Sequence, residues 1–209
     1  YMGDKDFTHE ILNGDIHTAN KNIAGLESRD QAKTFIYALI YGAGDGKLGA
    51  VVGGNKRDGK RLREHFFDNL PAFANLRTQV SGAAGRGFLK GIDGRKIYVR
   101  SVHSALNTLL QSAGAIVMKE ALDIFLKYIR SDSLAQARSV RGGEVIYIDA
   151  HVVANVHDEW QVEVKEEKNS LDLVGHYGVK AIQQAGTNLK LRCPLDGEYK
   201  IGDNWSETH

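Results

Sequence analysis

Two cations and two tyrosines recur at every fourth position of the segment SRDQAKTFIYALIYGAG, and this spacing constrains the fold more than any other feature. The four residues are Arg29, Lys33, Tyr37 and Tyr41. On an α-helix, steps of four residues advance by about 400°, so the four side chains form one stripe about 18 Å long. Ser28 and Gln31 have the spacing of a capping box, which predicts that the helix begins just ahead of Arg29.

The order of the side chains along this stripe indicates which ligand it suits. The cations lie at the N-terminal end, where the partial positive charge of the helix terminus also favours a polyphosphate. The tyrosine rings lie further along and suit a base and a sugar. Cations four apart are also common on solvated helix faces, and tyrosines at helical spacing are usually core residues. The stripe predicts a groove for a nucleoside triphosphate, with an ordinary packed and solvated helix as the alternative.

The bulk composition is that of an ordinary globular protein and gives no global sign of nucleic-acid binding. Of the 209 residues, 42% are hydrophobic and 25% are charged, and the net charge is +1. Nucleic-acid binding would therefore depend on local patches of charge. The single cysteine, Cys193, excludes an intramolecular disulfide and a cysteine cluster for zinc. No apolar run approaches about 18 residues and no signal-peptide pattern is present, so we expect a cytoplasmic protein without membrane contact.

The hydrophobic patterns predict an α+β fold in which helices dominate. Helices are expected at 16–27, 29–41, 60–69, 71–82, 104–130 and 166–185, with a short helix within 42–59. Hairpins are expected at 88–100, with the turn at Asp93 and Gly94, and at 150–164. We expect the polar segment 131–145 to be a loop with some helix, and the tail from Leu189 to add a short strand and an extended end.

The second hairpin carries reactive side chains at its turn. One face is expected to hold Val152, Ala154 and Val156 on the first strand and Trp160, Val162 and Val164 on the second. His157 and Asp158 would then form the turn, where hairpins ordinarily prefer Asn-Gly or glycine. Polar residues at a glycine-free tight turn favour a chemical role, with a solvated turn as the alternative. The carboxylates of Asp158 and Glu159 suit Mg²⁺, which prefers hard oxygen ligands.

Polar residues on two of the expected helices are further candidates. Asn107 and Gln111 lie four apart on one face of the long helix, and base pairs offer such amides acceptors throughout the minor groove. Simple surface polarity of the helix is the alternative. His17 lies about three turns before Arg29, and a lone histidine is more often a structural hydrogen-bonding residue.

Five motifs, in the correct order over nearly the whole chain, resemble those of family A DNA polymerases. They are GDIHTAN, the stripe written as R-x3-K-x3-Y-x3-YG, GIDGRKIYVRS, LNTLLQSAGA and VHDEW. The residues of the segments DIHTAN, AKTFIY, LNTLLQSAGA and NWSETH are most similar to those of replicative polymerases of short-tailed phages. The resemblance implies template-directed transfer of a nucleotidyl group from a dNTP to a primer 3′-OH by two Mg²⁺ ions.

The resemblance also implies roles for individual residues. Asp158 would ligate both metals, Glu159 would be a weaker partner, and Lys33 would act in catalysis. The implied nucleotide contacts are His17, Arg29, Lys33 and Tyr37. The implied DNA contacts are Tyr41, Gly42, Asn107, Gln111 and His157. In this family a tyrosine at the position of Tyr37 goes with acceptance of nucleotides that lack a 3′-OH, and a phenylalanine with their rejection.

The resemblance divides the chain into residues 1–102, as fingers with the first hairpin, and residues 103–209, as the C-terminal part of the palm. The second metal-binding aspartate of the family lies in an upstream motif, D-x-S-x-x-E-L-R, which does not occur here. We therefore expect an incomplete part, inactive alone, that needs N-terminal polymerase regions or a second polypeptide and works in a host cytoplasm if phage-encoded.

Two other functions compete with this interpretation. The first is a non-catalytic nucleotide- and DNA-binding fragment, or one half of a split polymerase. The second is a metal-dependent hydrolase built on His157, Asp158 and Glu159, which would leave the stripe from Arg29 to Tyr41 unexplained. A processivity partner cannot be identified from the sequence.

Overall fold

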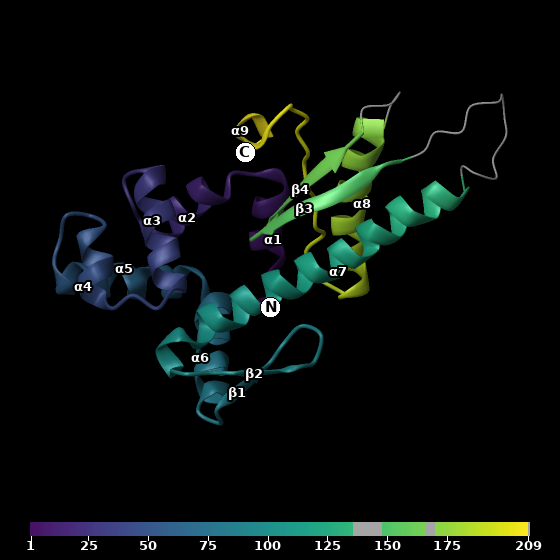
Figure 1. Ribbon diagram of the computed structural model, residues 1–209. Coiled ribbons are helices and arrows are strands. Elements are labelled where there is room, and N and C mark those ends of the chain that lie inside the picture. Colours follow the sequence, from purple (N-terminus) through teal and green to yellow (C-terminus); the bar gives the residue numbers. More distant parts are fainter. Residues whose placement is uncertain (136–147, 166–169, 209) are drawn as a thin grey trace. The chain divides into compact units, whose positions relative to one another are not determined.

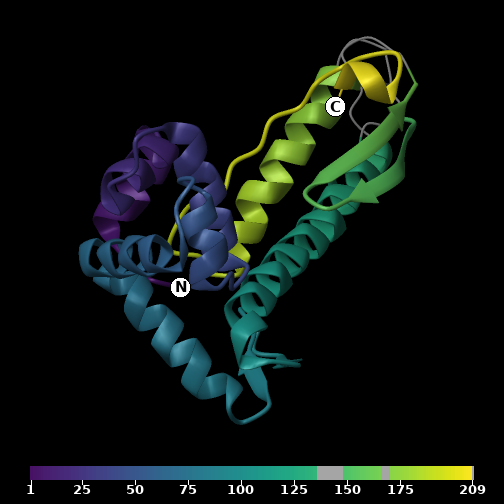
Figure 2. The same cartoon turned by 90° about the vertical axis from the view of Figure 1, so that its left-hand side faces the viewer.

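The computed structural model describes residues 1–135, 148–165 and 170–208, which form two compact units, Tyr1–Ser112 and Ala113–His209 (Figures 1 and 2). The first unit contains α1 (Lys5–Asn13), α2 (Ile16–Ala24), α3 (Arg29–Ile40), α4 (Asp45–Ala50), α5 (Lys56–Asn69), α6 (Pro71–Ala84), β1 (Phe88–Lys90), β2 (Lys96–Tyr98), the 3-10 helix η1 (Val102–Ser104) and the start of α7 (Ala105–Ala135). The second contains the rest of α7, β3 (Ala150–Val156), β4 (Glu159–Val164), α8 (Ser170–Asn188) and α9 (Trp205–Thr208). The predicted helix-dominated α+β class is confirmed.

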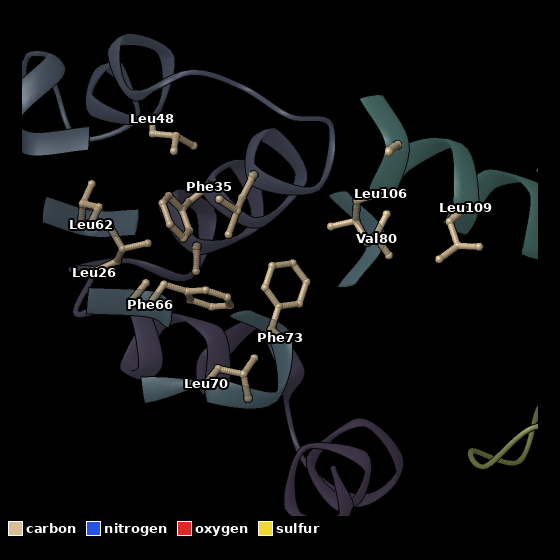
Figure 3. Packing of buried hydrophobic residues seen from close by; sticks show 14 of the residues in the cluster. Leu26, Phe35, Leu48, Leu62, Phe66, Leu70, Phe73, Val80, Leu106 and Leu109 are labelled. Carbon is tan, nitrogen blue, oxygen red and sulfur yellow. The ribbon is translucent and has the colours of Figure 1, made fainter. Parts of the chain in front are cut away.

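The core of the first unit is built around three phenylalanines from different helices. Phe35 of α3 and Phe73 of α6 both meet Phe66 of α5 edge to face, with ring centroids 5.7 and 5.6 Å from Phe66 (Figure 3). Such pairs stabilise by about 0.5–1.5 kcal/mol beyond the burial of their area. Phe35 and Phe66 are fully buried, so the face of α3 that carries Phe35 is fixed against α5 and the opposite face is left outward.

Backbone groups of α4 and α5 approach each other too closely for side chains. A β-carbon at Gly59 of α5 would overlap the carbonyl oxygen of Asp45, and one at Gly49 of α4 would overlap that of Asn55. The two glycines therefore permit a close backbone approach between α4 and the start of α5.

Local capping signals explain where several helices begin. The predicted capping box of α3 is present, with Gln31 N donating to Ser28 Oγ at 3.2 Å and the Gln31 side chain accepting from the Ser28 N–H. Pro71 occupies the first turn of α6, as predicted. The expected start of α5 at residue 60 is wrong, because Asn55 caps this helix and it begins at Lys56. The Asp58 carboxylate completes the capping box by accepting from the Asn55 N–H at 3.0 Å.

The hairpin β3–β4 packs on α7 and α8 in the second unit (Figures 1 and 2). Trp160 stacks on Phe125 of α7 with a centroid distance of 5.3 Å, and Val162 and Val164 lie on the same core, as expected. The expected face of β3 is wrong. Val152 pairs with Val162 on the core side, but a β-bulge follows, and Ala154 pairs with Gln161 on the other side.

Other differences concern the ends and the long helix. α1 was not predicted, although Asp4 caps it by accepting from Phe7 N at 2.9 Å. α7 continues to Ala135, beyond the expected end at residue 130 and into the segment expected to be a loop with some helix. The remainder of that segment lies outside the described residues, as do residues 166–169 before α8. The strand expected after Leu189 is wrong, because the described tail is extended and ends in α9. None of the helices in the described ranges is long and apolar enough to cross a membrane.

Candidate nucleotide and nucleic-acid site

The stripe on α3 faces outward along its whole length. Tyr37 and Tyr41 are 50% and 55% exposed, and Arg29 and Lys33 are exposed as well. The opposite face of α3 is buried through Ala32, Phe35 and Leu39. The alternative in which the tyrosines belong to the core is therefore wrong. The helix presents two cations and two rings to solvent in the predicted order.

Arg29 is held by a carboxylate that was not among the predicted site residues, that of Asp15. Its Nε and Nη2 donate to Oδ2 and Oδ1 of Asp15 at 2.9 and 3.3 Å, which is a bidentate pair. Asp15 also caps α2, where it accepts from His17 N and Thr18 Oγ1. The Arg29 guanidinium, followed by the Thr18 hydroxyl, holds the pKa of the Asp15 carboxyl well below its ordinary value. The signal was available, because Asp15 is the acidic residue of the GDIHTAN motif.

Lys33 and His17 have polar atoms available to a ligand. No ion pair of Lys33 occurs among the described residues. His17 is half-buried in the first turn of α2, and its Nδ1 is buried without a hydrogen-bond partner in the described part of the chain. A buried polar atom without a partner is costly and suits a site that is completed by a ligand or water.

Tyr41 and Gly42 directly follow α3 and line a hollow of about 530 Å³. Its lining residues are Thr34, Ala38, Tyr41, Gly42, Ala43, Lys47 and Val51. Gly42 has a φ of 79°, and a β-carbon there would lie 2.5 Å from the carbonyl oxygen of His103. Only glycine fits this position without strain, so the backbone after Tyr41 is held against the segment that leads into α7.

The side-chain amides of Asn107 and Gln111 on α7 lie in the first unit, as the stripe on α3 does. Gln111 Nε2 donates to Tyr41 Oη at 3.3 Å. Asn107, one turn earlier, has its side-chain oxygen buried without a hydrogen-bond partner among the described residues. The structure thus links Gln111 to the C-terminal end of the stripe.

The turn of the second hairpin carries His157 and Asp158, as predicted. His157 has a φ of 53°, a left-handed conformation that is uncommon outside glycine, and both side chains are exposed. Glu159 begins β4, is half-buried, and accepts hydrogen bonds from Gln161 Nε2 and from Trp205 Nε1, the latter at 3.1 Å. Trp205 was not among the predicted site residues, because it lies far along the chain from the hairpin.

Metal ligands are incomplete in this part of the chain. Asp158 supplies hard carboxylate oxygens, but the described residues contain no group of three or more His, Cys, Asp or Glu that could hold a metal ion. The candidate nucleotide residues lie in the first unit, and the residues from His157 to Glu159 lie in the second.

Comparison with known proteins decides the family. The sequence model described as DNA polymerase family A matches residues 3–207. The chain belongs to DNA polymerase family A. The resemblance drawn from the five motifs is thereby confirmed, and family A polymerases are in general metal-dependent enzymes.

Several curated members of family A are similar over almost the whole chain. The DNA-directed DNA polymerase of Enterobacteria phage T3 is 40% identical over 98% of this chain, and that of Escherichia phage T7 is 41% identical over 98%. DNA polymerase I of Aquifex aeolicus is 30% identical over 87%. The chain spans about 30% of the length of each of these three relatives.

A solved structure supports the fold of this family. It is the POL domain of Pol1 from M. smegmatis in complex with DNA primer-template and dNTP, with a TM-score of 0.71 and 17% identity. The match covers 88% of this chain and 34% of that one. The predicted fold class is therefore supported both by the elements of the chain and by this likeness.

Proposed function

We propose that the chain forms the fingers (residues 1–102) and the C-terminal part of the palm (residues 103–209) of a polymerase. The complete enzyme would transfer a nucleotidyl group from a dNTP to a primer 3′-OH on a DNA template. By complete enzyme we mean the polypeptide or assembly that joins this chain to the other parts of a polymerase domain. The observation that carries the proposal is the outward stripe of α3, with cations in its first two turns and tyrosine rings toward its C-terminal end.

The N-terminal part of the stripe would bind the triphosphate. Lys33 and Arg29 supply positive charge near the start of α3, and His17 offers a ring nitrogen from the neighbouring helix α2. The bidentate Asp15 contact orients the guanidinium of Arg29 before a nucleotide arrives. Lys33 would then stabilise charge that develops on the phosphates in the transition state.

The C-terminal part of the stripe would contact the sugar and the bases. Tyr37 would lie against the incoming sugar and base, and Tyr41 with Gly42 would stack at the templating position, next to the hollow. The close approach of Gly42 to the His103 carbonyl would fix the backbone next to Tyr41, which supports discrimination by shape. Asn107 and Gln111 would contact minor-groove acceptors of the primer–template pairs.

The turn of the second hairpin would hold the metal and the primer end. Two Mg²⁺ ions, when bound, would neutralise the triphosphate and activate the primer 3′-oxygen. The chemistry of Asp158 fits this metal, Glu159 would be its weaker partner, and His157 would contact the primer terminus. The remaining ligands would come from outside the described residues, so we expect the chain alone to be inactive.

Replacement of Lys33 tests the proposal. In the complete enzyme, Lys33→Ala should lower single-turnover incorporation by at least about 100-fold, since one lost contact to developing charge costs about that much. Primer–template affinity should change little. Lys5→Ala, which removes an exposed lysine from α1, serves as the matched control and should behave like the unsubstituted enzyme. Loss of DNA affinity with normal incorporation would contradict the assignment of Lys33.

The hydrolase alternative has no observation in its favour, since the described residues, His157, Asp158 and Glu159 included, contain no group of three or more His, Cys, Asp or Glu side chains placed so that they could hold a metal ion. A non-catalytic fragment remains as an outcome of the same assay. It would be indicated if the complete enzyme bound primer–template and dNTP but did not extend the primer.

A further inference from the structure

The last described residues of the chain return to the hairpin that carries Asp158. Trp205 Nε1 donates to Oε1 of Glu159 at 3.1 Å, across 46 positions of sequence. Thr208 Oγ1 donates to Oε1 of Gln161 at 3.1 Å. Both donors belong to α9, and both acceptors lie in the first half of β4, directly after the turn. All four residues belong to the second unit.

The extended tail before α9 is fastened to α8 (Figures 1 and 2). Tyr199 Oη donates to Asp172 Oδ1 at 3.1 Å, and Gln183 Nε2 donates to Asp196 Oδ1 at 3.0 Å. These contacts limit how far the tail can move from α8. They therefore reduce the freedom of α9, which follows a few residues later.

The end of the tail is also braced internally. The side chain of Glu207 accepts from Asp203 N at 2.9 Å and from Asn204 Nδ2 at 2.6 Å. A charge-assisted bond to a backbone N–H of this kind is short and directional. The indole of Trp205 is thus delivered to Glu159 by a segment that is held both to α8 and within itself.

We propose that Trp205 is a positioning residue for the metal-binding turn. Its indole N–H fixes the carboxylate of Glu159, and through Glu159 it fixes the backbone that presents Asp158. Gln161, which also donates to Glu159, is itself held by Thr208, so α9 acts on the turn through two neighbouring side chains. This inference rests on the proposed polymerase function, because Asp158 and Glu159 have their roles only there.

The decisive variant removes the N–H and keeps an aromatic ring. In the complete enzyme, Trp205→Phe should lower single-turnover incorporation about 10-fold, which corresponds to the loss of one hydrogen bond to a charged group. The dissociation constants for primer–template and dNTP should remain within about twofold of the unsubstituted values, since Trp205 is not one of the residues proposed to contact either ligand. The Mg²⁺ concentration for half-maximal rate should rise. A purely structural role for the ring would leave both rate and metal dependence unchanged.

A double-mutant cycle separates positioning from packing. If Trp205 acts through Glu159, then the double variant Glu159→Gln, Trp205→Phe should lower the single-turnover rate by much less than the product of the two single fold-changes. The matched control is Ser206→Ala, which alters the adjacent residue of α9, whose hydroxyl bonds to Asn204 and not to the hairpin. Thr208→Val removes the other hydrogen bond from α9 to β4, the bond to Gln161, and should give a smaller loss of rate.

A spectroscopic readout keeps the inference separate from the proposed function. The chain contains two tryptophans, so its indole N–H resonances can be assigned with Trp205→Phe alone. Glu159→Gln should shift the Trp205 resonance and leave that of Trp160 nearly unchanged. An unmoved Trp205 resonance, or normal incorporation by Trp205→Phe, overturns the inference alone. A shifted resonance in a complete enzyme that never extends a primer overturns the proposed function and shows the contact to be structural.

Discussion

Gln111 of α7 donates a hydrogen bond to the phenolic oxygen of Tyr41 at 3.3 Å, although the two residues are 70 positions apart in sequence. The sequence suggests separate roles for them, Tyr41 at the templating position and Gln111 at the primer–template minor groove. The contact joins the two within one compact unit. Shape-sensing at one base pair and contact with its neighbours would then be coupled.

This coupling predicts non-additive effects on fidelity. Tyr41→Phe and Gln111→Ala should each raise extension of mispaired primers, and the double variant should differ from the sum of the single effects by up to about 1 kcal/mol, as expected for an exposed neutral hydrogen bond. Gln79→Ala, an exposed glutamine of α6, should combine additively with Tyr41→Phe. If the effects of Tyr41→Phe and Gln111→Ala on the extension of mispaired primers are additive, the hydrogen bond between the two residues does not contribute to fidelity.

Gly42 should not tolerate a side chain. Gly42→Ala must adopt a φ of 79° and place a β-carbon 2.5 Å from the His103 carbonyl oxygen. We expect a loss of about 1–3 kcal/mol in the free energy of unfolding, measured by denaturant titration. Gly46→Ala is the matched control, because the space around Gly46 in α4 is open and alanine favours a helix by up to about 1 kcal/mol. Equal stability of the two variants would contradict the close approach at Gly42.

The pair between Asp15 and Arg29 should make stability depend on acid. The pKa of Asp15 is lowered in the folded chain, chiefly by Arg29, so the pair stabilises fully above the ordinary pKa of an aspartate, about 4. That contribution is lost progressively as the pH falls from there through the lower, folded pKa. Melting temperatures between pH 6 and pH 2 should therefore converge for the unsubstituted chain and Asp15→Asn. Asp68→Asn, at an exposed carboxylate of α5, should not alter the acid profile, and a constant gap for Asp15→Asn would refute the linkage.

The hydroxyl of Tyr37 should govern acceptance of nucleotides that lack a 3′-OH. The ring is half exposed on the stripe, where an incoming sugar could reach it. Tyr37→Phe in the complete enzyme should increase discrimination against dideoxynucleotides by at least about tenfold, roughly the value of one hydrogen bond. Competition between dNTP and ddNTP measures the ratio, with Tyr98→Phe on β2 as an exposed tyrosine control. An unchanged ratio would remove Tyr37 from the sugar pocket.

Local patterns predicted those parts of the structure that depend on neighbours in sequence. The capping box at Ser28 and the outward stripe follow from spacing within a single helix. The hairpin with His157 and Asp158 at its turn follows from alternation over a short segment. Each of these features is decided by interactions within a few residues, which a sequence displays directly.

Contacts between distant segments could not be obtained in this way. The β-bulge after Val152 depends on how β3 and β4 settle on α7 and α8, and alternation alone cannot reveal it. Trp205 reaches Glu159 only because the tail folds back along α8. The prediction of a short strand after Leu189 was wrong for the same reason. The described tail is held by side-chain contacts with α8 and not by pairing with a strand.

The interlocked backbones of α4 and α5 have a consequence for how such chains can vary by mutation. Every amino acid that a point mutation can put in place of a glycine carries a β-carbon, and at Gly49 or Gly59 that atom meets a carbonyl of the other segment. No substitution at Gly49 or Gly59 avoids the clash. A second substitution at the other glycine does not relieve it either, because each β-carbon clashes with a backbone atom and not with a side chain. In a library with every substitution at each position, Gly49 and Gly59 should tolerate none, whereas Gly46 should accept other residues. Sequence variation in this region should therefore be confined to the other positions.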